Sequence, residues 1–191
     1  FPCIEETNVV KVTVNNFDPG SISADQTICE NTAPAPLTSV TPTGDGTFTY
    51  KWYNSSDGVT FALIGGAVSE TYSPGLLAAD TWYRREVTST LNAMTCIEIT
   101  NVVKITVNNF LPGSISAAQP ICEGSIPAAF ASVTPTGDGV FTYQWKESTD
   151  GILFTDIALA TDETYAPPAL TQDTWYKRVV TSTLLGFPCF E

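Results

Sequence analysis

The chain has 191 residues, with 20 acidic side chains against 8 basic ones and no histidine, which gives a net charge of −12 at pH 7. A field of that sign repels phosphate backbones and anionic lipid surfaces, so we expect neither nucleic acid nor a membrane as a partner. No apolar stretch approaches the roughly 18 residues that a membrane helix needs, and without histidine a Ser-His-Asp catalytic triad cannot be built.

An internal repeat organises the sequence and holds without a gap over the whole chain. Cys96 to Glu123 is nearly a copy of Cys3 to Glu30, at an offset of 93 residues. The same offset relates Trp52 to Trp145. Self-similarity at one fixed period predicts two domains of the same fold, each large enough for its own core.

In chain order, the first predicted element is a strand at Ile4 to Val14, which alternates and is rich in Val and Thr. Clusters of turn residues then punctuate the chain, as at Asn15 to Gly20 and Asn108 to Gly113. The short strands predicted between such turns in the first copy are Ser21 to Ile28, Pro36 to Thr41, Phe61 to Ile64 and Thr71 to Pro74.

Two longer runs carry the clearest strand signals. Thr47 to Tyr53 places Phe48, Tyr50 and Trp52 on one face, which predicts a half-buried strand of an antiparallel sheet. Asp57-Gly58 follows as a hairpin turn, and Asp80 to Thr90 is the longest run. No amphipathic helical pattern of useful length occurs. About seven short strands per copy, with a Trp on the third, predict an all-β fold of two tandem immunoglobulin-like β-sandwiches.

The succession ICEG, TYQW, STDG, TYAP, DTWYKRVVTSTL, Cys and TNVVKITV resembles a known group of domains. These are the immunoglobulin-like repeats of very large surface proteins and adhesins of gliding and related Bacteroidota. The resemblance covers the whole chain in both copies. It implies secretion to the cell surface and a role in tandem stalks or adhesive filaments, without enzymatic activity in the repeats.

The domain boundaries implied by this resemblance do not coincide with the two ends of the chain. Residues 1–17 become the last strand of a preceding or neighbouring repeat, residues 18–109 form repeat 1, and residues 110–191 form repeat 2 without its last strand. A sandwich that lacks an edge strand exposes unpaired backbone groups. Either the chain is a window cut from a longer array, or the opening strand of one subunit completes the next. Both alternatives make neighbouring copies of the repeat, head to tail, the expected partners.

The five cysteines recur at fixed places and form no CxxC or Cys/His cluster, which favours disulfides in an oxidising compartment over zinc. They are Cys3, Cys29, Cys96, Cys122 and Cys189. Sequence distance suggests bonds within each copy, Cys29 to Cys96 and Cys122 to Cys189. The topology implied by the resemblance instead separates Cys29 from Cys96 by about 20 to 30 Å. It brings Cys29 beside Cys189, and Cys122 beside the counterpart of Cys96 in the following unit, and we favour this pairing.

Two arginines share a strand face with residues that belong in the core. Because an inward-pointing arginine must be paired, we predict buried ion pairs of Arg85 and Arg178, most directly with Glu70 and Glu163. Asp80 and Asp173 are the other carboxylates available to them.

Two sets of side chains could form a ligand site, and each also has a plain structural role. Aspartates in turns could meet around calcium, but no DxDxDG-like spacing occurs and an Asp-Gly turn needs no metal, so we expect no metal and no cofactor. They are Asp45, Asp138, Asp57, Asp150, Asp80 and Asp173. A second set of side chains could stack on sugar rings, but their alternation favours the core. This set is Trp52, Trp145, Trp82, Trp175, Tyr50 and Tyr143.

The sequence therefore predicts a non-catalytic, extracellular structural repeat of a surface adhesin or filament. The alternative is a carbohydrate- or protein-binding module with its site on the loops, which would contact surface glycans or other cells.

Overall fold

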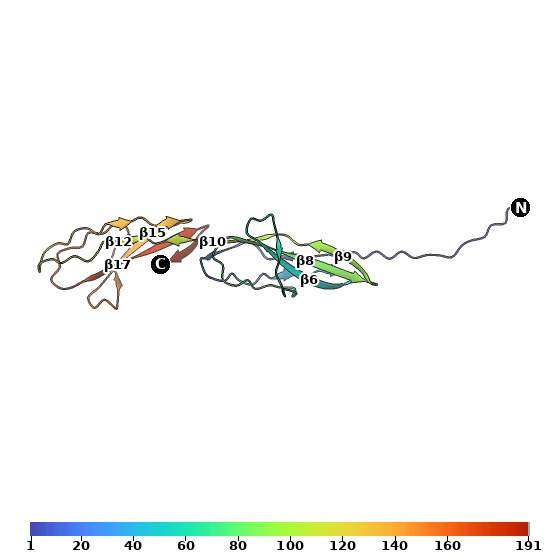
Figure 1. Ribbon diagram of the computed structural model, residues 1–191, viewed down its shortest axis with the longest axis horizontal. Coiled ribbons are helices and arrows are strands. Elements are labelled where there is room, and N and C mark those ends of the chain that lie inside the picture. The colour runs from blue at the N-terminus through green and yellow to red at the C-terminus, as the bar shows by residue number, and fades with distance from the viewer. Residues whose placement is uncertain (191) are drawn as a thin grey trace. The chain divides into compact units, whose positions relative to one another are not determined.

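The computed structural model describes residues 1–190, and β-strands are the regular structure of this range (Figure 1). The described residues contain no helix long and apolar enough to cross a membrane. The chain folds into two compact units. The first comprises Phe1–Ala24, Pro36–Tyr72 and Trp82–Val103; the second comprises Asp25–Ala35, Ser73–Thr81 and the chain from Lys104 onward.

The first unit is built around a long antiparallel hairpin. β6 (Thr47–Ser55) pairs with β7 (Ala62–Leu63) on one side and β8 (Thr81–Leu91) on the other, and β8 pairs with β9 (Met94–Ile99). Two short ladders complete it. They pair β1 (Phe17–Asp18) with β5 (Thr43–Gly44), and β2 (Ser21–Ile22) with β4 (Ser39–Val40).

The second unit repeats this plan and adds a parallel pair. β15 (Val140–Ser148) pairs with β16 (Thr155–Asp156) and β17 (Trp175–Leu184), and β17 pairs with β18 (Phe187–Phe190). The short ladders are β11 (Phe110–Leu111) with β14 (Thr136–Gly137), and β12 (Ser114–Ile115) with β13 (Ser132–Val133). The parallel pair is β3 (Gln26–Cys29) with β10 (Val103–Asn108).

The predicted alternation of the longest strands is confirmed. In β6, Trp52 is fully buried while Thr47, Thr49 and Lys51 are exposed. The ring of Trp52 lies 5.5 Å from that of Tyr72, centroid to centroid. An aromatic cluster on the inner face of each hairpin is thus the core that the period-2 pattern indicates.

The strand predicted at Ile4 to Val14 does not form within the single chain, and its pairing with a preceding or neighbouring repeat stays a prediction. Residues 1–16 form no strand, and residues 1–14 are exposed (Figure 1). The counterpart of this segment in the middle of the chain does form strands, β9 and β10, with a break after Ile99. The two segments differ because β9 pairs with β8 and β10 pairs with β3, whereas residues 1–14 pair with no described strand. A β-strand is stable only when its backbone groups are paired.

Candidate functional site: the repeat junction and an open strand groove

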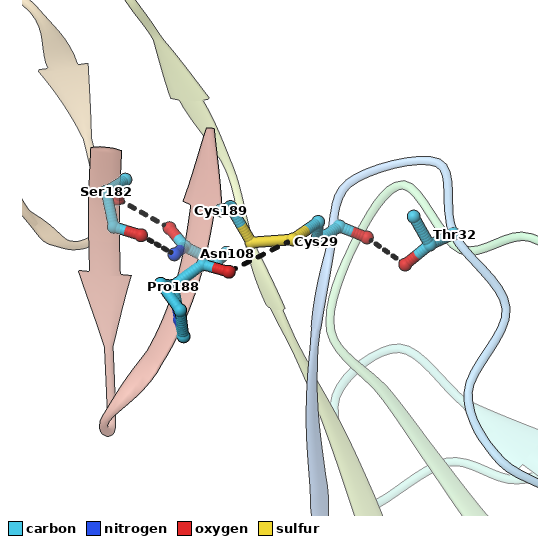
Figure 2. Close-up of a disulfide and its surroundings, with 6 residues drawn as sticks. All are labelled: Cys29, Thr32, Asn108, Ser182, Pro188 and Cys189. Atoms are coloured by element: carbon cyan, nitrogen blue, oxygen red, sulfur yellow. Dashed lines mark hydrogen bonds between the residues drawn. A yellow bond between two sulfur atoms is a disulfide. The ribbon is translucent and has the colours of Figure 1, made fainter. Parts of the chain in front are cut away.

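The two repeats are joined where β3 and β10 run side by side. Asn108 at the end of β10 lies opposite Cys29 at the end of β3. The Asn108 side chain donates from Nδ2 to the backbone oxygen of Ser182 at 2.9 Å and accepts a hydrogen bond from Ser182 Oγ at 2.8 Å (Figure 2). Both residues are buried. The end of the first copy is therefore fixed against β17 of the second copy, all within one compact unit.

A disulfide reinforces this junction. Cys29 of β3 is bonded to Cys189 of β18, with Cα atoms 5.6 Å apart and a sequence separation of 160 residues (Figure 2). Cys189 is 2% exposed and packs in a cluster with Phe110 and Val180. Of the two pairings that the sequence left open, the structure contains the one that joins successive repeats.

The other three cysteines are free thiols. Cys96 lies in β9 and is partly exposed, and Cys3 and Cys122 are exposed. The bonds within each copy that sequence distance suggests are therefore not formed, since Cys29 and Cys189 are bonded to each other. Sequence distance is misleading here because β3 and β18, which come from different copies of the repeat, fold into the same compact unit.

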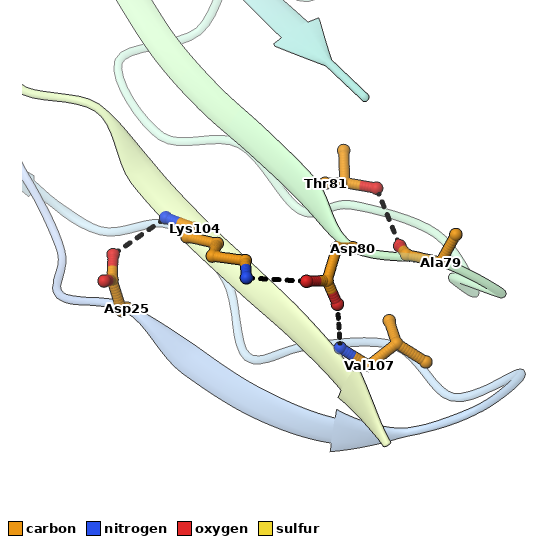
Figure 3. A network of polar contacts seen from close by, with 6 residues as sticks. All are labelled: Asp25, Ala79, Asp80, Thr81, Lys104 and Val107. Carbon is orange, nitrogen blue, oxygen red and sulfur yellow. Dashed lines mark hydrogen bonds and ion pairs between the residues drawn. The ribbon is translucent and has the colours of Figure 1, made fainter. Parts of the chain in front are cut away.

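A polar network also fixes β10 in place (Figure 3). Lys104 Nζ lies 2.6 Å from Asp80 Oδ2, and the other oxygen of Asp80 accepts the backbone N–H of Val107 at 2.8 Å. The backbone N–H of Lys104 donates to Asp25 Oδ1 at 2.7 Å. Both carboxylate oxygens of Asp80 therefore bind β10. These contacts account for the position of Asp80 without calcium or an arginine.

In repeat 2, no described strand occupies the position that corresponds to β10. A cavity of about 670 Å³ lies there, lined by residues 115–123 and 170–176 with Pro127 and Phe130. The counterpart of β3, residues 119–122, forms no strand. Ile28 of β3 is 6% exposed, whereas its counterpart Ile121 is 40% exposed. We call this cavity the strand groove, because it is open where repeat 1 holds a strand.

Residues 1–14 carry the sequence pattern of β9 and β10 but pair with no described strand. Val10, Val12 and Val14 are 75%, 83% and 62% exposed, while their counterparts in β10 are at most 1% exposed. Within the described residues, side-chain hydrogen bonds of this segment to the rest of the chain begin at Asn15. Its Nδ2 donates to the backbone oxygen of Ser89 at 3.1 Å, and Ser89 Oγ donates to its Oδ1 at 2.9 Å, as at the repeat junction.

One family model matches the chain twice, at residues 18–109 and 111–189, and the family is described as a domain of unknown function, DUF8696. The chain belongs to this family. No curated protein matches it. Each match covers one copy of the repeat, so the Cys29–Cys189 disulfide joins two successive DUF8696 domains.

Arg85 of the first DUF8696 domain is fully buried, as the alternation of β8 predicts. Its guanidinium donates to the backbone oxygens of Glu70 and Pro19 at 2.7 and 2.9 Å and to Oγ of Ser39. It also lies over the ring of Tyr50, 5.1 Å from the centroid. Burial lowers the pKa of Arg85. The three acceptors are bound by its two terminal nitrogens, while Nε is buried without a hydrogen-bond partner.

The second domain repeats this arrangement around Arg178. Its guanidinium donates to the backbone oxygens of Glu163 and Pro112 at 2.8 and 2.9 Å and to Oγ of Ser132. The predicted buried ion pairs with the carboxylates of Glu70 and Glu163 are wrong, since among the described residues neither arginine is in an ion pair. In both domains, neutral backbone and serine oxygens accept hydrogen bonds from the terminal guanidinium nitrogens, so no carboxylate has to be desolvated beside the arginine.

The aromatic residues do not gather into an exposed platform in the described part of the chain. Trp52 and Trp145 are fully buried, and their indole N–H groups donate to backbone oxygens. Tyr50 and Tyr143 lie under the guanidinium groups of the buried arginines. Trp175 is the exception, because it is 45% exposed and lines the strand groove. Its counterpart in repeat 1 is partly buried.

The turn aspartates have protein partners. Asp57 Oδ1 accepts the backbone N–H groups of Thr60 and Val59 at 2.7 and 2.8 Å and the hydroxyl of Ser55 at 2.7 Å. These hydrogen bonds lower the pKa of Asp57 to about 2. Asp150 stands in the same kind of turn in repeat 2. No group of three or more metal-ligating side chains lies close together within residues 1–190.

We therefore expect the thermal unfolding midpoint to be the same in excess EDTA and in excess calcium chloride. A metal that binds only the folded state must stabilise it, whereas Asp57 and Asp80 already have partners within the chain. Differential scanning calorimetry of the 191-residue chain in both buffers measures this. A midpoint several degrees lower in EDTA would show that a metal site exists.

Proposed function

We propose that this chain is a non-catalytic structural repeat of an extracellular array, in which successive domains are joined head to tail as the stalk of a surface adhesin or as a filament. The observation that carries the proposal is the Cys29–Cys189 disulfide. A covalent bond between successive domains would prevent their separation under load.

Further support comes from the way the repeats meet. β10 leaves the first copy and continues into β11 of the second with one residue between them, Asn109. Asn108 is buried against Ser182 at this point. A short connection with a buried polar contact limits the freedom of the next domain. This suits an extended array, in which each repeat contacts only its neighbours.

The redox chemistry of the bond supports an extracellular location. Disulfides persist in oxidising compartments and are rare in the reducing cytosol. The resemblance to surface adhesin repeats of Bacteroidota agrees with this location, and the excess of acidic residues keeps a long array soluble.

Antibodies raised against the chain test the proposal. We expect them to label intact cells, and we expect a non-reducing gel of surface extracts to show reactive species far larger than one chain. An antibody against a cytoplasmic protein serves as the control and labels cells only after permeabilisation. If the chain also requires permeabilisation, the proposal is wrong. Binding of the purified chain to one glycan on an array, abolished by a loop substitution, would favour the binding-module alternative.

A further inference from the structure

We propose that the second repeat binds a neutral pyranose sugar in a pocket between the turn that follows β15 and the loop that precedes β17. The pocket has a volume of about 360 Å³, near the lower end of the range in which small ligands bind. Its lining comes from residues 147–155 and 169–174, and we call it the turn pocket. The inference goes beyond the proposed structural role and does not rest on it, since one domain contains the whole pocket.

The lining differs from the equivalent surface of repeat 1 in one direction. Three alanines of repeat 1 are replaced by side chains that form hydrogen bonds, and a neutral amide is replaced by a carboxylate. These replacements are Ala62 by Thr155, Ala78 by Thr171, Ala79 by Gln172 and Asn54 by Glu147. The two repeats pair their strands in the same register at this point. The fold therefore does not require these polar groups, because repeat 1 forms the same hairpin without them.

These polar side chains are free to bind a ligand. Among the described residues, no hydrogen bond or ion pair involves the side chains of Glu147, Thr155 or Gln172. Glu147 is partly buried, and it is the one charged side chain in the lining. Removing a carboxylate from water is costly unless donors replace the lost hydrogen bonds. A ligand that brings several hydroxyl donors would therefore bind favourably beside Glu147.

The chemistry of the lining fits a sugar better than other small ligands. A carboxylate accepts hydrogen bonds at two oxygens, whereas a threonine hydroxyl and a glutamine amide both donate and accept. Neighbouring hydroxyl groups on one ring can use all of these groups. Leu153 and Leu170 supply apolar surface for the C–H face of the ring. A phosphate or carboxylate on the ligand would be repelled, because the charge of Glu147 is negative.

This surface stays open to solvent in a repeat that has another repeat after it. Five of the equivalent positions are exposed in repeat 1, although repeat 2 follows it. They are Asn54, Ser56, Ala62, Ala78 and Ala79. The turn pocket thus differs from the strand groove, whose position in repeat 1 is filled by β10.

Hydrogen bonds hold both walls of the turn pocket. Asp150 Oδ1 accepts the backbone N–H groups of Ile152 and Leu153 at 2.7 and 2.9 Å, which fixes the turn. The backbone oxygen of Leu170 accepts the N–H of Gly124 at 2.7 Å, which fixes the loop. A site that is formed before the ligand arrives requires little ordering on binding.

The first test exchanges the turn pocket for the surface of repeat 1. Saturation-transfer NMR of the intact chain with methyl glycosides of glucose, galactose, mannose and N-acetylglucosamine should identify a sugar that binds. We expect a dissociation constant on the order of 1 mM. The variant Glu147→Asn/Thr155→Ala/Thr171→Ala/Gln172→Ala should bind at least about tenfold more weakly. Its residues are those that repeat 1 already accommodates, and circular dichroism melting checks that it remains folded.

A matched control and a reverse exchange complete the test. Thr142→Ala changes an exposed threonine of β15 outside the pocket, and the affinity should change less than about twofold. The reverse variant places the four polar residues in repeat 1, as Asn54→Glu/Ala62→Thr/Ala78→Thr/Ala79→Gln. With Leu76→Ala added, to match Ala169 of repeat 2, the chain should bind two sugars in place of one.

The inference is wrong if no glycoside binds, or if the fourfold variant binds as well as the unchanged chain. Tighter binding of methylammonium than of any sugar would also overturn it, because Glu147 would then form a cation site. A positive result makes repeat 2 a sugar-binding domain within the array. The high-mass surface species decide separately whether that array exists, so each proposal can fail without the other.

Discussion

Reduction of the Cys29–Cys189 disulfide is expected to lower the free energy of unfolding of the second unit by about 2 to 5 kcal/mol. The bond closes a loop of 160 residues in sequence, and for a loop of that length the chain-entropy relation gives about 5 kcal/mol as the upper end. Guanidinium unfolding of the oxidised chain and of the chain in a phosphine reductant measures the difference. The Cys29→Ala/Cys189→Ala variant should match the reduced chain.

The free cysteines provide the control for this measurement. Cys3→Ser and Cys122→Ser change exposed thiols, so each should alter the free energy of unfolding by less than about 0.5 kcal/mol. If the oxidised and reduced chains unfold at the same denaturant concentration, the disulfide does not stabilise the junction, and the main support for a clamped array is lost.

Arg85→Ala is expected to destabilise the first unit by about 3 to 5 kcal/mol. The substitution leaves the backbone oxygens of Glu70 and Pro19 and the hydroxyl of Ser39 without their donor, in a fully buried site. A buried acceptor that loses its partner keeps the cost of desolvation without the compensating bond. Thermal and guanidinium unfolding of the variant and the unchanged chain measures the loss.

The adjacent residue is a matched control. Arg84 is partly exposed, and its guanidinium stacks on the ring of Phe61 at 4.2 Å from the centroid. Arg84→Ala removes the same side chain from the opposite face of β8 and should cost less than about 1 kcal/mol. Comparable losses in the two variants would contradict the assignment of Arg85 as the buried anchor of the domain.

Much of this architecture was predictable because its signals are local. The offset that relates Cys3–Glu30 to Cys96–Glu123 indicates two like domains, and the alternation of Thr47 to Tyr53 indicates which face of β6 is buried. The inward direction of Arg85 follows from the same period of two. These properties depend only on strand geometry and on residues close together along the chain.

Other features depended on contacts between residues far apart in the sequence, which the pattern of residues along the chain does not reveal. Ile4 to Val14 has the composition of a strand but lacks a partner in the described chain, whereas its counterpart forms β10 because β3 lies beside it. The partners of Arg85 are backbone oxygens from three distant segments, and no side-chain pattern identifies a carbonyl group.

The sequence by itself determined the repeat, the all-β class and the inward faces of the long strands, because period and alternation are properties of the chain alone. The tertiary structure alone decided that Cys29 is bonded to Cys189, and that one repeat holds a strand where the other has a groove. The physical reason is that a disulfide and a strand pairing both depend on proximity in space. Here Cys29 and Cys189 lie in the same compact unit, whose fold sets that proximity across 160 residues of sequence.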